Sequence, residues 1–578
     1  MPDPSARTAV SGGAEERGMK MNRNGLHAEI ERTLLAYVKA RSTTNTAGER
    51  EAGAFFLRRV SEMRYFKAHP DFFGSYAIEG DALGRSVGWA LLRGRGDRTV
   101  VLIHHNDVVD VEDFRTLKDY AYSPIELEGK LLEIAETLPD EVRRDLESGA
   151  YLFGRGVCDM KGGGSIQLAL LDRYGEEEFT GNLVVLGLPD EENLSAGMRA
   201  AVKLLSALKR EHGLNYVLMI NSEPHQRRTP DRGVLSTGSI GKMMPFVYMR
   251  GSLAHAGKVF EGFNPVRVLS KVVCKTETCT DFSDVQGSEF SPPPTWLHLK
   301  DSKTQYDVSM PLSAYGCFSV LTLSRTPREV LERLRRVSLE SFEESIRELN
   351  SAYEALCRAS KRPFSALPWR ARVLSVGELI AEAERDRGES FRRAFLDTIA
   401  ELKRLAESED RSLIELNRIF VDWLFDCTDD LSPCLVYGLI PPYYPHVSNI
   451  GLSGLDPRVV NLSDELEAFA VEAFGQEYET ERFYTGISDL SYCSISNVAE
   501  AAAALRDAMP FWGLLYDLPL DAMADISMPC INIGPWGKDF HKMTERVLKE
   551  DLFDRTPRLI AKALELVLGG GDKTNLRG

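Results

Sequence analysis

Gly154-Arg-Gly-Val-Cys-Asp-Met-Lys-Gly-Gly-Gly164 is the stretch around which this chain of 578 residues is organised. It holds five glycines, one acid (Asp159) and one lysine, and an apolar, helix-like run follows at 166–171. Glycine lets the backbone approach a ligand closely, so the stretch fits a phosphate-binding loop or a loop that presents Asp159 to a cation. A phosphate loop needs Lys followed by Ser or Thr, whereas Lys161 precedes three glycines. The cation is therefore the favoured partner.

Four short apolar runs lie on either side of this stretch, and polar residues follow each of them. The runs are 99–103 before His104-His-Asn-Asp107, 182–188 before Pro189-Asp-Glu-Glu192, 216–220 before Asn221-Ser-Glu-Pro-His225, and 530–533 before a segment that reaches His541. Helical stretches separate the first three runs, as in a mostly parallel sheet covered by helices. Ligands bind beyond the carboxyl ends of such strands. The sequence therefore predicts an α/β fold with one shared site at one sheet edge.

The middle of the chain has a different pattern. Strand-like runs at 243–249, 307–325 and 434–440 alternate with a helix from about 265, a long amphipathic helix at 326–359 and a charged helical region within 360–430. A proline-rich turn is expected at 441–446. We predict a disordered tail at 1–20, a first domain formed by 21–236 and 450–578, and an α+β domain inserted at 237–449. The simplest interpretation of the extra helical region is a solvated hairpin.

Bulk composition excludes several classes of function. The net charge of −16 argues against a general affinity for nucleic acid or anionic membrane. The nine cysteines form no C-x-x-C pair and are odd in number, which favours a reducing compartment. No apolar run is long enough to span a bilayer, and the first 20 residues lack the apolar segment of a secretory signal. A cytoplasmic protein with no nucleic-acid or membrane partner is expected.

Asp159 and the residues that follow the four runs together supply two imidazoles and three carboxylates. These candidate metal ligands are His105, Asp159, Glu192, Glu223 and His541. Mixed nitrogen and oxygen ligation suits Zn²⁺, with Co²⁺ or Mn²⁺ as substitutes. Five ligands exceed the need of one tetrahedral ion, whereas two ions bridged by one carboxylate use them all. Taken singly, a buried histidine or a solvated acidic triplet is the simpler interpretation of each motif.

Six motifs, in this order along the chain, resemble those of a di-zinc hydrolase family. They are HHND, GRGVCDMKGGG, PDEEN, NSEP, GSLAHAG and GKDFHKMTERV. The family includes aminoacylases, glutamate carboxypeptidases and succinyl-diaminopimelate desuccinylase. The further stretches DVVDVEDF, PPYYPH and GISDLSY are similar to those of the RocB-type arginine-utilisation proteins. The resemblance covers about residues 27–565.

This resemblance implies a zinc-hydrolase catalytic domain with a mixed, mostly parallel sheet between helices, and an inserted lid domain. It implies that Asp159 bridges two Zn²⁺, that Glu192 and His541 hold one ion, and that His105 and Glu223 hold the other. Glu191 matches the general acid/base, and Asp107 matches the residue that supports the ligand histidine. The implied reaction is hydrolysis of an amide bond in a small N-acyl amino acid or short peptide. By association alone, an arginine or ornithine derivative is the expected substrate.

Three residues of the inserted domain match weaker features of the family. His255 matches a lid histidine that donates to the oxyanion, and in several relatives this residue comes from the partner subunit of a homodimer. Arg325 matches a lid arginine that grips a carboxylate. Asp307 stands where the family commonly has asparagine, and an acid there favours a cationic substrate group. As simpler interpretations, His255 is a loop histidine and Arg325 a surface arginine.

A second hypothesis from another class is a metal-bound binding or regulatory protein without catalysis. The altered residue at Asp307 keeps this hypothesis open, whereas the presence of Glu191 favours an enzyme. Asp489, in GISD, matches a family loop near the site, and a structural role is expected for it.

Overall fold

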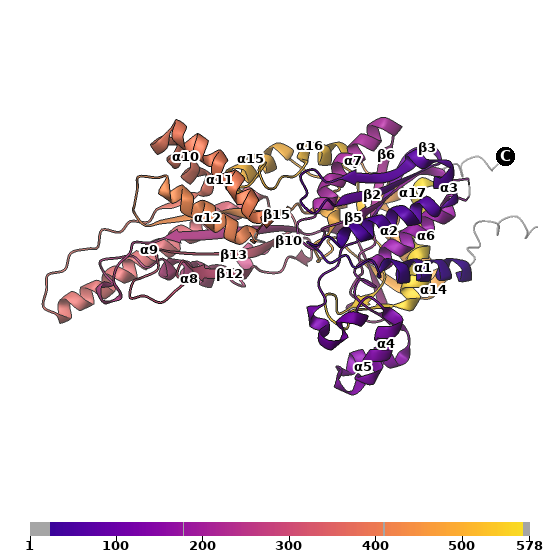
Figure 1. The fold of residues 1–578 in the computed structure, drawn as a ribbon, viewed down its shortest axis with the longest axis horizontal. Helices are drawn as coiled ribbons and strands as arrows, with labels where there is room; N and C mark the ends of the chain where they lie inside the picture. Colours follow the sequence, from indigo (N-terminus) through magenta and orange to yellow (C-terminus); the bar gives the residue numbers. More distant parts are fainter. Residues whose placement is uncertain (1–22, 177, 409–410, 453, 570–578) are drawn as a thin grey trace, which may run out of the picture.

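The protein is described by a computed structural model that covers residues 23–176, 178–408, 411–452 and 454–569. The tail predicted at 1–20 lies outside the described residues. Two large sheets form the frame of the molecule, and each is covered by helices (Figure 1). The mixed α/β class predicted from the sequence is confirmed.

The larger sheet has eight strands in the order β1-β2-β5-β3-β6-β18-β7-β17. Their bounds are β1 Phe73–Ala77, β2 Ser86–Arg93, β3 Arg95–His105, β5 Thr180–Leu188, β6 Asn215–Asn221, β7 Arg232–Ser236, β17 Glu477–Glu481 and β18 Cys530–Asn532. The central strands β5, β3, β6 and β18 run parallel, as the sequence predicted. At one edge β1 and β2 are antiparallel, and the sequence analysis missed both strands.

Helices cover both faces of this sheet because alternate strand side chains point to opposite faces. Val100 and Leu102 of β3 pack with α1, α6 and α17, whereas Val101 and Ile103 pack with α7. The helices on the first face are α1 Arg23–Tyr37, α2 Glu49–Glu62, α6 Lys161–Tyr174, α14 Leu462–Phe474 and α17 Thr556–Leu568. The opposite face is covered by α7 Ala196–His212 and α16 Leu520–Ile526. The central strands are therefore buried on both sides.

The glycines that start α6 allow this helix to lie directly on the strand ends. A Cβ atom at Gly163 would lie 2.3 Å from the carbonyl oxygen of Ser222, and one at Gly164 would lie 2.4 Å from the His104 ring. Any side chain at these positions would push the helix away from β3 and β6. The glycine-rich stretch thus serves close packing of α6 on the ends of β3 and β6.

The smaller sheet has five strands in the order β12-β13-β9-β15-β14. Their bounds are β9 Gly241–Arg250, β12 Thr295–Asp301, β13 Ser313–Thr322, β14 Val373–Ser375 and β15 Cys434–Tyr444. We call this sheet and its helices the inserted unit (residues 241–444). It extends away from the larger sheet along the long axis of the molecule (Figure 1). The domain boundaries at 236/237 and 449/450 stay a prediction.

One face of the smaller sheet packs against α8 (Pro265–Thr276) and α9 (Pro327–Ala359). The long amphipathic helix predicted at 326–359 is confirmed as α9. Thr326 and Glu329 form a reciprocal capping box at its start, which satisfies free N–H groups of the first turn.

The region within 360–430 is not a solvated hairpin, so that interpretation was wrong. It forms α10 (Val376–Arg387), α11 (Glu389–Ser408) and α12 (Leu413–Asp426), which cover the second face of the smaller sheet. Phe246 and Tyr248 of β9 pack there with Leu379, Phe420 and Leu424. These helices are highly charged, so their apolar stripe was not recognised in the sequence. Burial of that stripe against the sheet stabilises the extra layer.

The proline-rich segment also differs from its prediction as a turn from residue 441. Strand β15 continues through Pro441 and Pro442 to Tyr444, with a shift of register relative to β9 between Ile440 and Tyr444. Prolines lack an N–H group, and they are tolerated in a strand where the regular ladder is interrupted.

A small sheet of order β19-β20-β4 joins distant parts of the chain beside the large sheet. Its strands are β4 Tyr151–Phe153, β19 Gly537–Lys538 and β20 Arg546–Leu548. Beside it lie α4 (Pro124–Glu133) and α5 (Asp140–Ser148), and the remaining α-helices are α3 Arg64–Ala68, α13 Pro457–Val460 and α15 Val498–Ala508. The short strands β8 Gly238–Ser239, β10 Val285–Gln286, β11 Glu289–Phe290 and β16 Val447–Ser448 form two further pairs.

Within the described ranges, every helix is either too short or too polar to cross a lipid bilayer.

Candidate metal centre

The five candidate ligands come from five separate segments that meet at one edge of the large sheet. His105 ends β3, Glu192 follows β5, and Glu223 follows β6. Asp159 lies between β4 and α6, and His541 lies between β19 and β20. Since β5 and β6 are the two neighbours of β3, their carboxyl ends bring the first three side chains together.

The two carboxylate oxygens of Asp159 face two different imidazoles. Oδ1 lies 2.9 Å from Nε2 of His105, and Oδ2 lies 3.2 Å from Nε2 of His541. His541 Nε2 is also 3.1 Å from Oε1 of Glu192, and His105 Nε2 is 3.7 Å from Oε1 of Glu223. The cluster therefore divides into two donor groups that share Asp159.

The electrostatics of this cluster fit a cation. Burial, followed by repulsion from Asp159 and Glu192, raises the pKa of Glu223 well above its usual value. Hydrogen bonds to Asp159 and Glu192 raise the pKa of His541 to about 10. Ligand atoms of His105, Asp159 and Glu192 all lie within 4.8 Å of one another. A concentration of acids in a buried place is costly without a compensating positive charge, and metal ions supply that charge by replacing the imidazole protons.

Asp107 supports the site in two ways. The carbonyl oxygen of its main chain lies 3.0 Å from Nδ1 of His105, whereas its carboxylate is 3.6 Å from the same nitrogen. The carboxylate instead accepts the main-chain N–H groups of Glu191 and Glu192, at 3.1 and 3.2 Å, and the hydroxyl of Thr44. Asp107 thus fixes the His105 ring through its main chain and the acidic turn through its side chain.

Glu191 is buried beside the ligands, with 8% of its surface exposed. Burial raises the pKa of Glu191 well above its usual value, and repulsion from Glu223 and Glu192 acts in the same direction, whereas the attraction of His105 opposes the shift. A carboxylate in this environment is adjacent to the cluster without occupying either donor group. Its position suits proton transfer near a bound metal.

The turn that carries Glu191 depends on residues that the sequence analysis missed. Asp190 adopts a left-handed conformation with φ 70°, which aspartate tolerates better than most residues. Nη1 of Arg85 donates to Asp190 at 2.6 Å and to the buried Glu49 at 3.0 Å. Arg85 and Glu49 stand in no recognisable motif and are far from Asp190 in the sequence, so only the fold reveals this contact.

The three predicted residues of the inserted unit lie elsewhere. His255 is exposed beyond the end of β9, and its Nδ1 accepts the N–H of Gly257 at 3.0 Å. The Arg325 guanidinium donates to the carbonyl of Asp281, and the exposed Asp307 pairs with Lys303. Within the described part of the chain, the hydrogen-bond and ion-pair partners of these three side chains all belong to the inserted unit.

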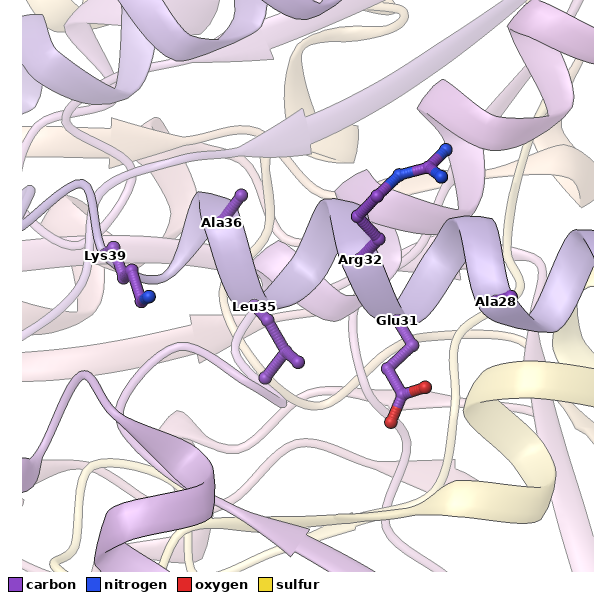
Figure 2. A pocket seen from close by; sticks show the side chains of 6 residues that line it. All are labelled: Ala28, Glu31, Arg32, Leu35, Ala36 and Lys39. Atoms are coloured by element: carbon purple, nitrogen blue, oxygen red, sulfur yellow. The ribbon is translucent and has the colours of Figure 1, made fainter.

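A hollow on the molecular surface runs along α1, apart from this cluster. It is lined by Ala28, Glu31, Arg32, Leu35, Ala36 and Lys39 (Figure 2). Five of the six residues belong to α1, Lys39 follows its end, and none of them is a candidate ligand. The hollow therefore adds nothing to the chemistry of the site.

Comparison with known proteins identifies the arrangement. The model of peptidase family M20/M25/M40 matches residues 135–509. Protein YqjN of Bacillus subtilis (strain 168) is 31% identical over 547 residues, which cover 93% of this chain and 96% of YqjN. Protein RocB of the same organism is 28% identical over 542 residues, which cover 92% of this chain and 93% of RocB. The predicted similarity to RocB-type proteins is confirmed.

Among solved structures, an M20 family metallo-carboxypeptidase, Sso-CP2 from Sulfolobus solfataricus, superimposes with a TM-score of 0.51. The match covers 93% of this chain and 99% of the carboxypeptidase, at 12% sequence identity. At this level of identity the likeness concerns the fold.

Proposed function

Because the chain belongs to peptidase family M20/M25/M40, and is therefore a hydrolase of peptide or amide bonds, we propose that it cleaves a small N-acyl amino acid or short peptide with the help of two Zn²⁺. The observation that carries the proposal is the position of Asp159, whose two oxygens face His105 and His541 separately. A carboxylate between two donor groups suits a pair of ions rather than one.

Each donor group would hold one ion. One group consists of His541, Glu192 and an oxygen of Asp159, and the other of His105, Glu223 and the second oxygen of Asp159. Imidazole and carboxylate donors suit Zn²⁺, and Co²⁺ or Mn²⁺ would be substitutes.

The residues of the chain then divide the work of the reaction. When bound, the two ions lower the pKa of a shared water and polarise the amide carbonyl. Glu191 takes a proton from the attacking water and delivers it to the leaving amine. His255 supplies a hydrogen bond to the developing oxyanion. Because Nδ1 of His255 accepts from Gly257, the neutral ring carries its proton on Nε2, which is the atom free to donate.

An arginine or ornithine derivative is the substrate class that we favour, on the strength of the similarity to RocB-type proteins. The sequence analysis also expected Asp307 to favour a cationic group. The exposed Asp307 carboxylate pairs with Lys303, so a cationic substrate group would share this carboxylate with the lysine.

The direct test combines metal analysis with a substrate panel. Purified protein should contain two transition-metal ions per chain and should hydrolyse at least one member of a panel of N-acyl amino acids and dipeptides, with basic ones included, in Zn²⁺, Co²⁺ or Mn²⁺. Removal of metal by a chelator should abolish hydrolysis, and added metal should restore it. Tight ligand binding without turnover across the panel would instead favour a non-catalytic binding protein.

A homodimer is proposed because His255 lies far from the metal centre of its own chain. Lys242, the second residue of β9, is close enough to Glu191 for their charges to interact. His255 follows the opposite end of this ten-residue strand, which at ~3.3 Å per residue places it about 30 Å away. A second copy of the chain would have to bring its own His255 to the site.

The edge strand β12 offers a surface for that second copy. In the described part of the chain β13 is its one neighbouring strand, so apart from the N–H of Trp296, which donates to Glu277, its other edge is open to a further strand. Leu297 and Leu299 on this strand are more than half exposed, at 53% and 54%. Pairing of β12 with its counterpart would satisfy the backbone and cover both leucines.

Mixing two inactive variants distinguishes the two origins of His255. His255→Ala and Glu191→Ala should each be inactive, yet co-refolded mixtures should recover roughly a quarter of wild-type activity, since half of the dimers are mixed and each mixed dimer has one intact site. Steady-state hydrolysis provides the measurement, with sedimentation confirming the dimer. If His255 acted within its own chain, the mixture would stay inactive.

A further inference from the structure

We propose that Glu545 is a positioning residue whose carboxylate fixes the main chain that carries Asp159, and thereby sets the spacing between Asp159 and His541. The inference rests on the proposed function, since it concerns the two-metal site. Glu545 stands in the motif with His541, four residues further along the chain, but neither the motif nor the spacing assigned it a task.

The Glu545 carboxylate is fully buried, and both of its oxygens accept hydrogen bonds from the loop that carries Asp159. Oε1 accepts the main-chain N–H groups of Gly156 at 2.9 Å, Cys158 at 3.2 Å and Asp159 at 3.3 Å. Oε2 accepts Nη1 of Arg155 at 2.7 Å. A single side chain thus holds four donors within one five-residue segment.

These hydrogen bonds supply acceptors for main-chain N–H groups of the loop. Residues 154–160 belong to neither a helix nor a strand, so their N–H groups lack the partners that regular structure provides. Buried N–H groups must find acceptors, and hydrogen bonds to a charged acceptor are stronger than neutral ones. Because Asp159 is itself one of the bound residues, its main chain is held at a defined distance from Glu545.

Glu545 also constrains His541 through the chain that joins them. Its carbonyl oxygen accepts the N–H of Gly154, and the next residue, Arg546, begins the pairing of β20 with β4. Arg546 is 1% exposed and donates to Asp539, two residues before His541. The segment that bears His541 is thus anchored after His541 to the segment that bears Asp159, and Arg546 fixes the part before His541 through Asp539.

A glutamine cannot perform the same task. Its amide has one acceptor oxygen and one NH₂ group, which only donates. If the oxygen faces the loop, the NH₂ group opposes the buried Arg155. If the oxygen faces Arg155, the loop N–H groups lose their acceptor. Either orientation leaves buried donors unpaired and lets the Asp159 loop shift relative to His541.

The experiment compares zinc affinities of the full-length protein and its variants. Glu545→Gln should weaken zinc binding about 10- to 100-fold, the usual effect of removing a partner behind the ligands, as measured by competition with a chromogenic chelator. The visible spectrum of the Co²⁺-loaded variant should change as well, since it reports ligand geometry. Glu545→Asp keeps the charge but is one methylene too short, so a smaller loss in the same direction is expected.

Asp551→Asn is the matched control. Like Glu545, Asp551 lies in the C-terminal part of the chain, is fully buried and pairs with an arginine, which is Arg227. The Asp551→Asn variant should have a lower melting temperature and an unchanged zinc affinity. Unchanged zinc affinity in Glu545→Gln and Glu545→Asp would overturn the inference. Wild-type protein that binds no transition metal would instead overturn the proposed function, so the two failures are distinguishable.

Discussion

Replacing Glu191 with glutamine should slow amide hydrolysis by about 10²- to 10⁴-fold, the contribution usual for general acid–base catalysis. The variant keeps the size and hydrogen-bonding shape of the side chain but cannot accept a proton from the attacking water. Because Glu191 belongs to neither donor group, both metal ions should remain. Rates with the best substrate of the panel, together with metal content per chain, provide the measurement.

The control for this variant is Glu126→Gln, which removes an exposed carboxylate from the first turn of α4. It should leave both the rate and the metal content unchanged. A Glu191→Gln enzyme with wild-type turnover would remove Glu191 from the mechanism and require another base at the site.

Replacing Asp159 with alanine should abolish binding of at least one metal ion, and hydrolysis with it. Asp159 is the residue whose two oxygens face both imidazoles, so its loss takes one donor from each group at once. The loss of metal should therefore exceed that of a Glu223→Ala variant, which empties only one group. Metal content after dialysis, measured by atomic emission, gives the stoichiometry directly.

Asp172→Ala is a suitable control for Asp159→Ala, because Asp172 lies on the following helix and pairs with Arg59 at 2.7 Å, away from the site. It should retain two ions per chain. Two ions retained in Asp159→Ala would show that another group forms the bridge.

Part of the fold could be predicted because local patterns and global structure agree. The apolar runs at 99–103, 182–188 and 216–220 became β3, β5 and β6, and the polar residues that follow them meet at one edge. The helix at 326–359 was equally clear, because its apolar residues recur at helical spacing over many turns. In contrast, β2 was missed. The apolar residues by which α10–α12 pack on the smaller sheet were not recognised, because these helices also carry many charged residues.

Residues that act through distant contacts could not be assigned in the same way. Arg85 fixes the turn before Glu191, and Glu545 holds the loop of Asp159. Each of these residues is far along the chain from the segment that it contacts. Neither type nor spacing marks them, because a buried arginine or glutamate is defined by its partners. Asp307 shows the same limit, since its exposed carboxylate pairs with Lys303, a contact that no motif indicated.

The sequence by itself determined which side chains are available to bind metal, because ligand type and position after a strand are local properties. His105, Glu192, Glu223 and His541 were predicted as candidate ligands in that way, and Asp159 was predicted from its glycine-rich stretch. The family resemblance had implied how they divide around Asp159, and the tertiary structure added the distances. Only the tertiary structure decided that His255 lies at the far end of the inserted unit and that Glu545 binds the loop of Asp159. Distances between segments far apart in sequence arise from packing of the whole chain, and no local pattern encodes them.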